Sequence, residues 1–529
     1  MFGTVMSDAG GTCEYVLDPD DPETWGGGNN DRCYIKDVKL NQDGVWACQR
    51  GTEENEDFCI FHKGVDKKDD EKVRSEFIIS IENPSHRNDC CFIGGKFGDL
   101  NIKNLYIQDI DYKINLNHSE FYGELNAQYS DINSNLTFRG SRLSETDFSG
   151  ANINGKLDFL SAEFEEWAHF SRVSFYGGTN FGSSVFKNGA SFVESEFGAS
   201  ADFQDAVFIS GPDRPPRTGA AAFTNADFKR SAYFSGAKCE QGGRFGFSDA
   251  NIQDANMRGA HLTDARFTRA NLIGANISSA NLDGAVLQQA NLTEANLSNA
   301  SLSGAELNQA IITRANLFSA DLIGASFYGA IFSQAQINGE TTFGDRCVND
   351  PEFDGEFAAD IHADKTERLN KAAGQYRIIE KIARENAFPD MVGQNFIRRQ
   401  DIHREQHQQR GRWGRWLRAT ASKYVLEYGE NPWRLIATGL IIVVGFGLLY
   451  PLVGGLQPTG GSPITASRVI ENPLLLAQSI YYSTLTFTTL GMGDFLPVGL
   501  GRVLTTLETS LGAIIIALLV FVFGRRAAR

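Results

Sequence analysis

The sequence predicts a multidomain protein with a β-helix, a helical linker and an all-α membrane domain. Three observations predict this order. Large apolar residues recur every five positions through the middle of the chain, charged helical segments follow, and two long apolar stretches lie near the C-terminus. A chain of 529 residues is too long for one compact core, so separate domains are expected. We place these domains at residues 1–92, 93–345, 346–411 and 412–529.

Residues 1–92 are predicted to form an irregular N-terminal domain, because neither a helical nor a strand period persists in them. Residues 1–70 hold 16 acidic and 7 basic side chains. Such an acidic surface argues against a nucleic-acid-binding groove. No apolar segment typical of a secretory signal follows Met1, so we expect this domain in the cytoplasm.

Six of the eight cysteines lie before residue 92, and a reducing compartment favours thiols or metal ligands over disulfides. Cys59 and His62 have a spacing that suits two zinc ligands on one turn. The zinc ligands of this hypothesis are Cys13, Cys33, Cys48, Cys59 and His62. Buried free thiols are the alternative, because the other intervals are long and contain no closely spaced cysteine pairs.

A period of five begins near Phe92 and becomes strict from Ile252 to Ile337. In the strict part, eighteen consecutive positions five apart hold Ile, Leu, Met or Phe, and alanine stands two residues before each. Neither a helix nor a flat strand keeps such positions on one face. A chain that turns a corner every five residues does, and four sides close a coil of about 20 residues with strand-like spacing between coils.

Residues 290–294 (ANLTE) and 320–324 (ADLIG) resemble the A(D/N)LXX pattern of the pentapeptide-repeat family. The resemblance implies a right-handed quadrilateral β-helix and covers nearly half of the chain. The family includes acidic duplex mimics that bind topoisomerases. A membrane-anchored interaction scaffold is therefore one alternative function.

Residues 364–409 are charged and hold apolar side chains at helical spacing, such as Leu369 and Tyr376. Phe388-Pro389-Asp390 interrupts this pattern, which predicts a helical hairpin. Arginine and tryptophan residues begin the segment 412–426 and are typical of a helix that lies at a membrane surface.

Residues 435–453 form an uncharged run, about 28 Å long as a helix, and residues 503–523 form a second run that contains Glu508. Arginines precede the first span and follow the second, so we expect a plasma-membrane protein with both termini in the cytoplasm. Between the spans, Asn472-Pro473 is typical of a helix start. The apolar helix predicted at 474–487 is too short to cross the bilayer, so it should enter and return.

The loop that follows this short helix alternates glycine with larger residues. Glycine reaches backbone conformations closed to other residues, so successive carbonyl oxygens can face one axis. Four copies of such a loop form rings of oxygens that replace the hydration shell of a cation. The predicted selectivity-filter residues are Thr488, Thr489, Leu490, Gly491, Met492, Gly493 and Asp494.

The stretch 481–494 is similar to the potassium-channel family, whose signature is TTVGYGD. The resemblance implies a homotetramer in a lipid bilayer, permeating K⁺, and support of the filter by Tyr481 and Tyr482. Leu490 and Met492 replace the valine and the aromatic residue of that signature, so another monovalent cation is an alternative to K⁺.

Two residues of the second span are candidates for roles around the filter. The resemblance implies that Gly512 is a gating hinge. Glu508 lies within the span, where an unpaired carboxylate is costly. We expect it to accept hydrogen bonds from filter amides or to pair with Arg502. The alternative is that its side chain reaches the headgroup layer.

These features predict a tetrameric, potassium-conducting cation channel whose cytoplasmic repeat domain regulates gating through an unidentified regulator. The alternatives are a non-selective cation channel, the interaction scaffold, and a pore subunit that requires another chain. For the pore region alone, the alternative is a hairpin of two membrane anchors with a glycine-rich turn. No spaced histidine cluster, nucleophile–base arrangement or phosphate-binding loop is recognisable, so no enzymatic activity is expected.

Overall fold

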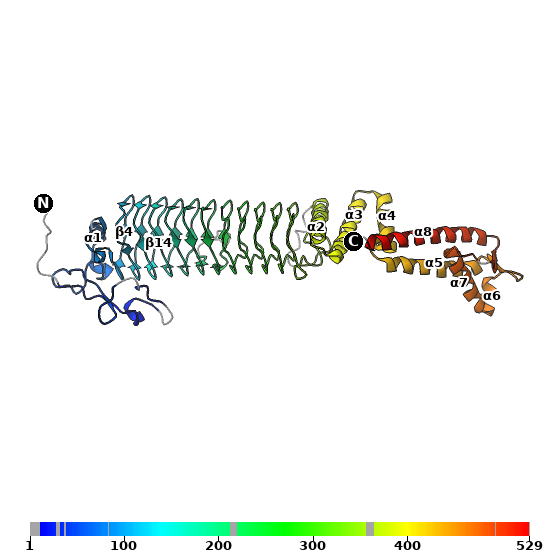
Figure 1. The fold of residues 1–529 in the computed structure, drawn as a ribbon, viewed down its shortest axis with the longest axis horizontal. Helices are drawn as coiled ribbons and strands as arrows, with labels where there is room; N and C mark the ends of the chain where they lie inside the picture. The colour runs from blue at the N-terminus through cyan, green and yellow to red at the C-terminus, as the bar shows by residue number, and fades with distance from the viewer. Residues whose placement is uncertain are drawn as a thin grey trace. The chain divides into compact units, whose positions relative to one another are not determined.

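The structure of the chain is a computed structural model, and it divides into two compact units, Met1–Ile361 and His362–Arg529 (Figure 1). The residues that it describes are 11–27, 32–35, 39–82, 84–211, 220–355, 364–491 and 493–527.

A parallel β-helix occupies most of the first unit (Figure 1). Its short strands run from β3 (Lys96–Phe97) to β28 (Phe245–Gly246) and form two sheets of 7 strands and two of 6. Every strand pairs with the fourth strand before or after it, as β10 (Leu136–Thr137) does with β14 (Leu157–Asp158). Successive strands therefore form the four sides of one coil, which confirms the predicted β-helix.

The strictly repeating part continues the β-helix with single bridges in place of strands. Asn251 bridges to Asn271, and Asn271 to Asn291, so each coil takes 20 residues. Ala290 and Leu292 are both fully buried, as the five-residue pattern requires. In the earlier coils phenylalanines take the large inward position and stack on one another. The stacked centroid distances include 4.7 Å for Phe138–Phe159 and 5.4 Å for Phe159–Phe181.

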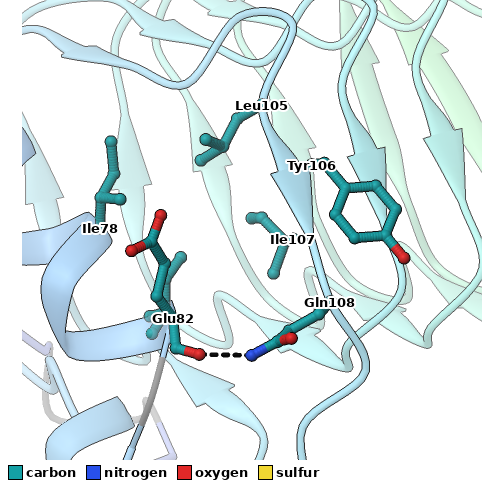
Figure 2. Close-up of a pocket in the computed structure, with 7 residues that line it drawn as sticks. Ile78, Glu82, Leu105, Tyr106, Ile107 and Gln108 are labelled. Carbon is teal, nitrogen blue, oxygen red and sulfur yellow. Dashed lines mark hydrogen bonds between the residues drawn. The ribbon is translucent and has the colours of Figure 1, made fainter.

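The N-terminal segment covers the first coil of the β-helix. Helix α1 (Asp70–Glu82) lies beside β5 (Tyr106–Ile107), and the Gln108 side-chain amide donates to the Glu82 carbonyl (Figure 2). Phe77 of α1 packs on Phe92, with 4.7 Å between ring centroids. Apolar residues that would be exposed at the open end of a solenoid are thereby buried.

The second unit begins with a helical hairpin, as the sequence predicts. Helices α2 (Lys365–Glu385) and α3 (Pro389–Gln409) pack against each other, and Pro389 occupies the first turn of α3. The Arg399 guanidinium donates two hydrogen bonds to the buried Glu380 carboxylate, at 2.6 and 2.9 Å. A bidentate pair of this kind fixes the register between the two helices.

The remaining helices carry the apolar segments. In the described residues, two helices are long and apolar enough to cross a membrane: α5 (Pro432–Leu452), with mean hydropathy 2.3, and the Gly501–Gly524 part of α8 (Gly501–Ala527), with 2.2. The elements around them are α4 (Trp413–Leu426), β29 (Leu456–Pro458), α6 (Ala466–Glu471), α7 (Leu474–Phe487) and β30 (Phe495–Pro497). Strands β29 and β30 pair antiparallel, so the segments before α6 and after α7 lie side by side.

Candidate functional site

Helix α7 packs against both long apolar helices, and glycines permit the closest approaches. A Cβ atom at Gly512 of α8 would lie 2.0 Å from the Phe487 carbonyl oxygen at the end of α7. A Cβ atom at Gly447 of α5 would lie 2.9 Å from the Ile480 Cα atom. The backbone of α7 therefore lies very close to the backbones of α5 and α8. No larger side chain fits at Gly512 unless one of the helices shifts.

Apolar side chains complete the contact between α5, α7 and α8. Phe487 lies at its centre, where the last turn of α7 meets both long helices. The buried members of this cluster are Leu435, Val443, Phe487, Ile515 and Val522. The C-terminal end of α7 is therefore held in a packed interior, and the loop that follows starts from a fixed point.

The carboxylate of Glu508 is fully buried, with 0% of the residue exposed. It accepts a hydrogen bond from the Tyr450 hydroxyl of α5 at 2.7 Å and one from the Ser483 hydroxyl of α7. The expected partners were filter amides or Arg502, and the alternative was the headgroup layer. In the described residues the carboxylate has neither kind of partner and does not reach the surface, because this face of α8 packs against α5 and α7. The Arg502 guanidinium instead donates to the Pro497 carbonyl at 3.3 Å.

A second hydroxyl group extends this network. The Thr505 hydroxyl lies 3.2 Å from the Tyr450 hydroxyl and 3.1 Å from the Tyr482 hydroxyl. The two tyrosine rings meet edge to face at 5.1 Å. Tyr482 is buried, whereas Tyr481 is 45% exposed and meets Phe495 at 6.4 Å between ring centroids. Of the two tyrosines predicted to support the filter, only Tyr482 joins this network in the described residues.

The substitution Tyr450→Phe should weaken the contact between α5 and α8. It removes one hydroxyl donor from a buried carboxylate, which costs about 1–3 kcal/mol. We expect a lower unfolding temperature of the detergent-solubilised protein, measured by a thermal shift assay. Tyr481→Phe is the matched control, because its hydroxyl makes no hydrogen bond in the part of the chain that the structure describes. Equal unfolding temperatures for the two variants would contradict the prediction.

The predicted filter residues form the loop that leaves the C-terminal end of α7. The Thr488 hydroxyl donates to the Thr484 carbonyl at 2.7 Å and so closes the helix. Thr489 and Gly491 have positive φ values of 58° and 42°. Met492, the fifth predicted filter residue, lies outside the described residues. Two left-handed residues in this short run break the strand alternation that would point successive carbonyls to opposite sides.

The end of the loop is fastened to the β29 turn. The Thr459 hydroxyl donates to the Gly493 carbonyl at 2.9 Å, and the Thr459 amide donates to the Asp494 carbonyl at 3.0 Å. Between these anchors Leu490 is 67% exposed. Within one chain the loop is therefore held at both ends and exposed in its middle.

Four of the five predicted zinc ligands meet in the first unit. Cys13, Cys48, Cys59 and His62 are buried, and their ligand atoms all lie within 4.8 Å of one another. Cys33, the fifth predicted ligand, lies outside this cluster. The adjacent Tyr34 amide donates to the His118 ring at 2.8 Å, which holds this segment on another part of the first coils.

Sequence reasoning missed three residues of the membrane unit: Tyr450, Ser483 and Thr459. Tyr450 and Ser483 are polar side chains inside apolar helices, and that was the available signal, because hydroxyl groups in such helices usually have a hydrogen-bond partner. Nothing in the local sequence distinguishes Thr459 from other loop threonines. Its role follows only from the pairing of β29 with β30.

The family comparisons agree with this geometry. The C-terminal residues 461–529 match the family model described as "Ion channel". Protein LctB of Bacillus caldotenax is 33% identical over 93 residues, which cover 17% of this chain and 68% of LctB. The chain belongs to the ion channel family. The models described as "Pentapeptide repeats" match residues 138–185, 247–284, 280–317 and 295–334. The ion channel is therefore a pentapeptide-repeat protein fused to a two-transmembrane pore domain of the potassium-channel type.

Solved structures of pentapeptide-repeat proteins are similar to parts of this ion channel. HetL of the cyanobacterium Nostoc is 20% identical, covers 51% of this chain and 94% of its own, and has a TM-score of 0.20. Rfr23 of Cyanothece is 33% identical, covers 18% of this chain and 61% of its own, and has a TM-score of 0.13. The channel and repeat families together point to a membrane protein that is not an enzyme.

Proposed function

We propose that this ion channel is a homotetrameric cation channel of the plasma membrane that conducts K⁺ through the loop Thr488 to Asp494. In this proposal residues 412–529 form the pore domain, with both termini in the cytoplasm. The family membership supports an ion-conducting role. The finer statements depend on the loop and on the helices that hold it.

The observation that carries the proposal is the position of this loop. It begins where the short helix α7 ends, and the C-terminal end of a helix carries about half a negative charge, which favours a cation nearby. Glycines and left-handed residues allow its carbonyls to turn toward one axis. Its exposed middle, in a segment anchored at both ends by Thr459 and α7, suits a surface that meets other copies of itself. Four copies supply the rings of oxygens that a dehydrated cation needs.

K⁺ is the favoured ion because five of the seven loop residues are identical to the potassium-channel signature TTVGYGD: Thr488, Thr489, Gly491, Gly493 and Asp494. Leu490 preserves an aliphatic side chain where the signature has valine. Glu508 supports the filter indirectly in this proposal. It ties α8 to α7 through Ser483, and α7 carries the loop. A non-selective cation channel is the competing outcome.

The repeat domain is proposed to regulate gating through the helical linker. Asp401 of α3 accepts a hydrogen bond from Tyr428 at 2.8 Å and pairs with Lys423 of α4 at 2.9 Å. Glu427, which follows α4, pairs with Arg434 of α5 at 2.7 Å. These ion pairs link α3 to α4, and the end of α4 to α5. A displacement of α3 would therefore be transmitted to the first membrane helix, α5, through polar contacts.

Flux from proteoliposomes tests the proposed function. We expect the purified full-length channel to release K⁺ from K⁺-loaded liposomes and to release much less Na⁺ from Na⁺-loaded ones. Equal fluxes of the two ions would favour the non-selective channel. Absence of both fluxes, from protein that is correctly inserted and tetrameric by cross-linking, would contradict an autonomous channel.

A further inference from the structure

The cluster of Cys13, Cys48, Cys59 and His62 lies in the first unit and belongs to no part of the proposed ion pathway. It contains three thiols and one imidazole, each at most 5% exposed. The Sγ atoms of Cys13 and Cys59 lie 3.4 and 3.2 Å from His62 Nδ1, and the Sγ atoms of Cys48 and Cys59 lie 3.9 Å apart. From this geometry we propose that the four residues bind one structural zinc ion, which fastens the N-terminal segment as a cap on the β-helix.

The distances match a tetrahedral zinc site. Zinc binds sulfur at about 2.3 Å and nitrogen at about 2.0–2.1 Å, which separates two sulfur ligands by about 3.8 Å and sulfur from nitrogen by about 3.5 Å. A disulfide between Cys48 and Cys59 would require about 2.05 Å between their sulfur atoms. All four ligand positions are buried, and closed Cys3His sites of this kind are structural rather than catalytic.

The surroundings of His62 prepare one ring nitrogen for a metal. Its Nε2 atom lies 2.9 Å from the Ile93 carbonyl oxygen, so Nε2 carries the proton and donates it, and the Nδ1 lone pair faces the thiols. The Tyr15 ring stacks on the imidazole with centroids 4.1 Å apart and an interplanar angle of 8°. A hydrogen-bonded carbonyl behind a histidine ligand is the usual second contact in zinc sites.

The ligands come from three stretches with little secondary structure of their own. Cys13 precedes β1 (Val16–Leu17), Cys48 follows β2 (Trp46–Ala47), and Cys59 and His62 share one turn. Two strands of two residues cannot hold such a segment in a fixed fold. The bonds between zinc and its four ligands would supply the missing free energy of folding, as in small zinc domains.

The same turn is attached to the β-helix. His62 reaches the carbonyl of Ile93, which precedes β3, and the Lys96 amide of β3 donates to the Phe61 carbonyl at 2.7 Å. The Phe61 ring also meets Phe92 at 4.9 Å. A metal that orders this turn therefore orders the cover over the first coil, whose backbone edge would otherwise be open to solvent.

Metal analysis of the full-length protein, purified under reducing conditions from zinc-supplemented medium, tests the site. We expect about one zinc ion per chain in the unchanged protein and in Cys90→Ser, a control with an equally buried cysteine. Cys33→Ser should also keep its zinc. The zinc content of Cys59→Ser should be lower than that of the unchanged protein by a factor of about ten or more. Equal zinc contents in Cys59→Ser and Cys90→Ser would overturn the proposal.

Cobalt substitution tests the site without any variant, so a misfolded mutant cannot confuse the outcome. After chelation and addition of Co²⁺, the unchanged protein should show thiolate-to-cobalt absorption in the near ultraviolet and tetrahedral bands in the visible, and zinc should remove both. A protein that shows neither signal has no such site. Because these measurements do not depend on ion flux, they stand whether or not the channel conducts.

Limited proteolysis tests the capping role. Chelation of the zinc should speed cleavage within residues 11–63 by about tenfold or more, and the β-helix coils after residue 252 should stay protected. Re-addition of Zn²⁺ should restore protection. Zinc-loaded and chelated protein that are cleaved at the same rate would contradict the cap.

Discussion

The substitution Gly491→Ala should reduce K⁺ flux to the background of empty liposomes. Gly491 has a φ of 42°, in the left-handed region, where an alanine Cβ costs about 1–2 kcal/mol. In a tetramer each of the four copies of the proposed filter contains this strained residue. Even a small displacement of the carbonyl oxygens would remove ligands that replace the hydration shell of the ion. The measurement is K⁺ release from proteoliposomes.

Gly460→Ala is the matched control for that experiment. Gly460 also has a positive φ, 79°, and among the described residues no atom lies within 4 Å of the position of an added Cβ, as at Gly491. The two substitutions therefore introduce a similar local strain, but only one of them lies in the proposed filter. We expect Gly460→Ala to keep its flux. Similar fluxes from the two variants would remove Gly491 from the conduction path.

The substitution Gly512→Ala should destabilise the membrane unit and reduce flux. The new methyl group would lie 2.0 Å from the Phe487 carbonyl oxygen, and the obstacle is backbone, which cannot rotate away. Helix α8 must then move from α7, and overpacking of this kind costs about 1–3 kcal/mol for each chain. A thermal shift assay and liposome flux measure the two effects.

Gly524→Ala is the control on the same helix, because no atom of the residues that the structure describes lies within 4 Å of its added Cβ. Alanine there should preserve or raise the unfolding temperature, since it favours the helix by up to about 1 kcal/mol over glycine. The pair also separates two roles for Gly512. If Gly512 acts only as the gating hinge, its alanine variant will keep the unfolding temperature of Gly524→Ala and change flux alone.

For Glu508, the sequence predicted part of its role and the structure was needed for the rest. A carboxylate within an apolar span indicates a functional or structural partner, and that inference needed only the sequence. The identity of the partner needed the packing of three helices, because Tyr450 and Ser483 lie 58 and 25 residues away along the chain. Gly512 is similar. The resemblance suggested a hinge, and the structure adds a backbone contact with Phe487.

The zinc hypothesis shows the same limit in the first unit. Cys59 and His62 could be paired from their spacing, since both lie on one turn. Cys13 and Cys48 joined them only through the fold of the N-terminal segment, and Cys33 was separated from them by the contact of Tyr34 with His118. The spacing of cysteines along the sequence therefore could not predict that Cys13 and Cys48 complete the cluster.

The sequence by itself determined the architecture, because its signals are periodic and local. The strict five-residue repeat predicts a coil with four sides. The two long apolar segments, with a short apolar segment between them, predict two membrane spans and a short helix between them. Only the tertiary structure decided which polar groups meet Glu508, which cysteines share one point, and where a glycine admits a neighbouring backbone. These contacts join residues far apart in the chain, and their partners depend on which face each helix or loop turns inward, which local patterns leave open.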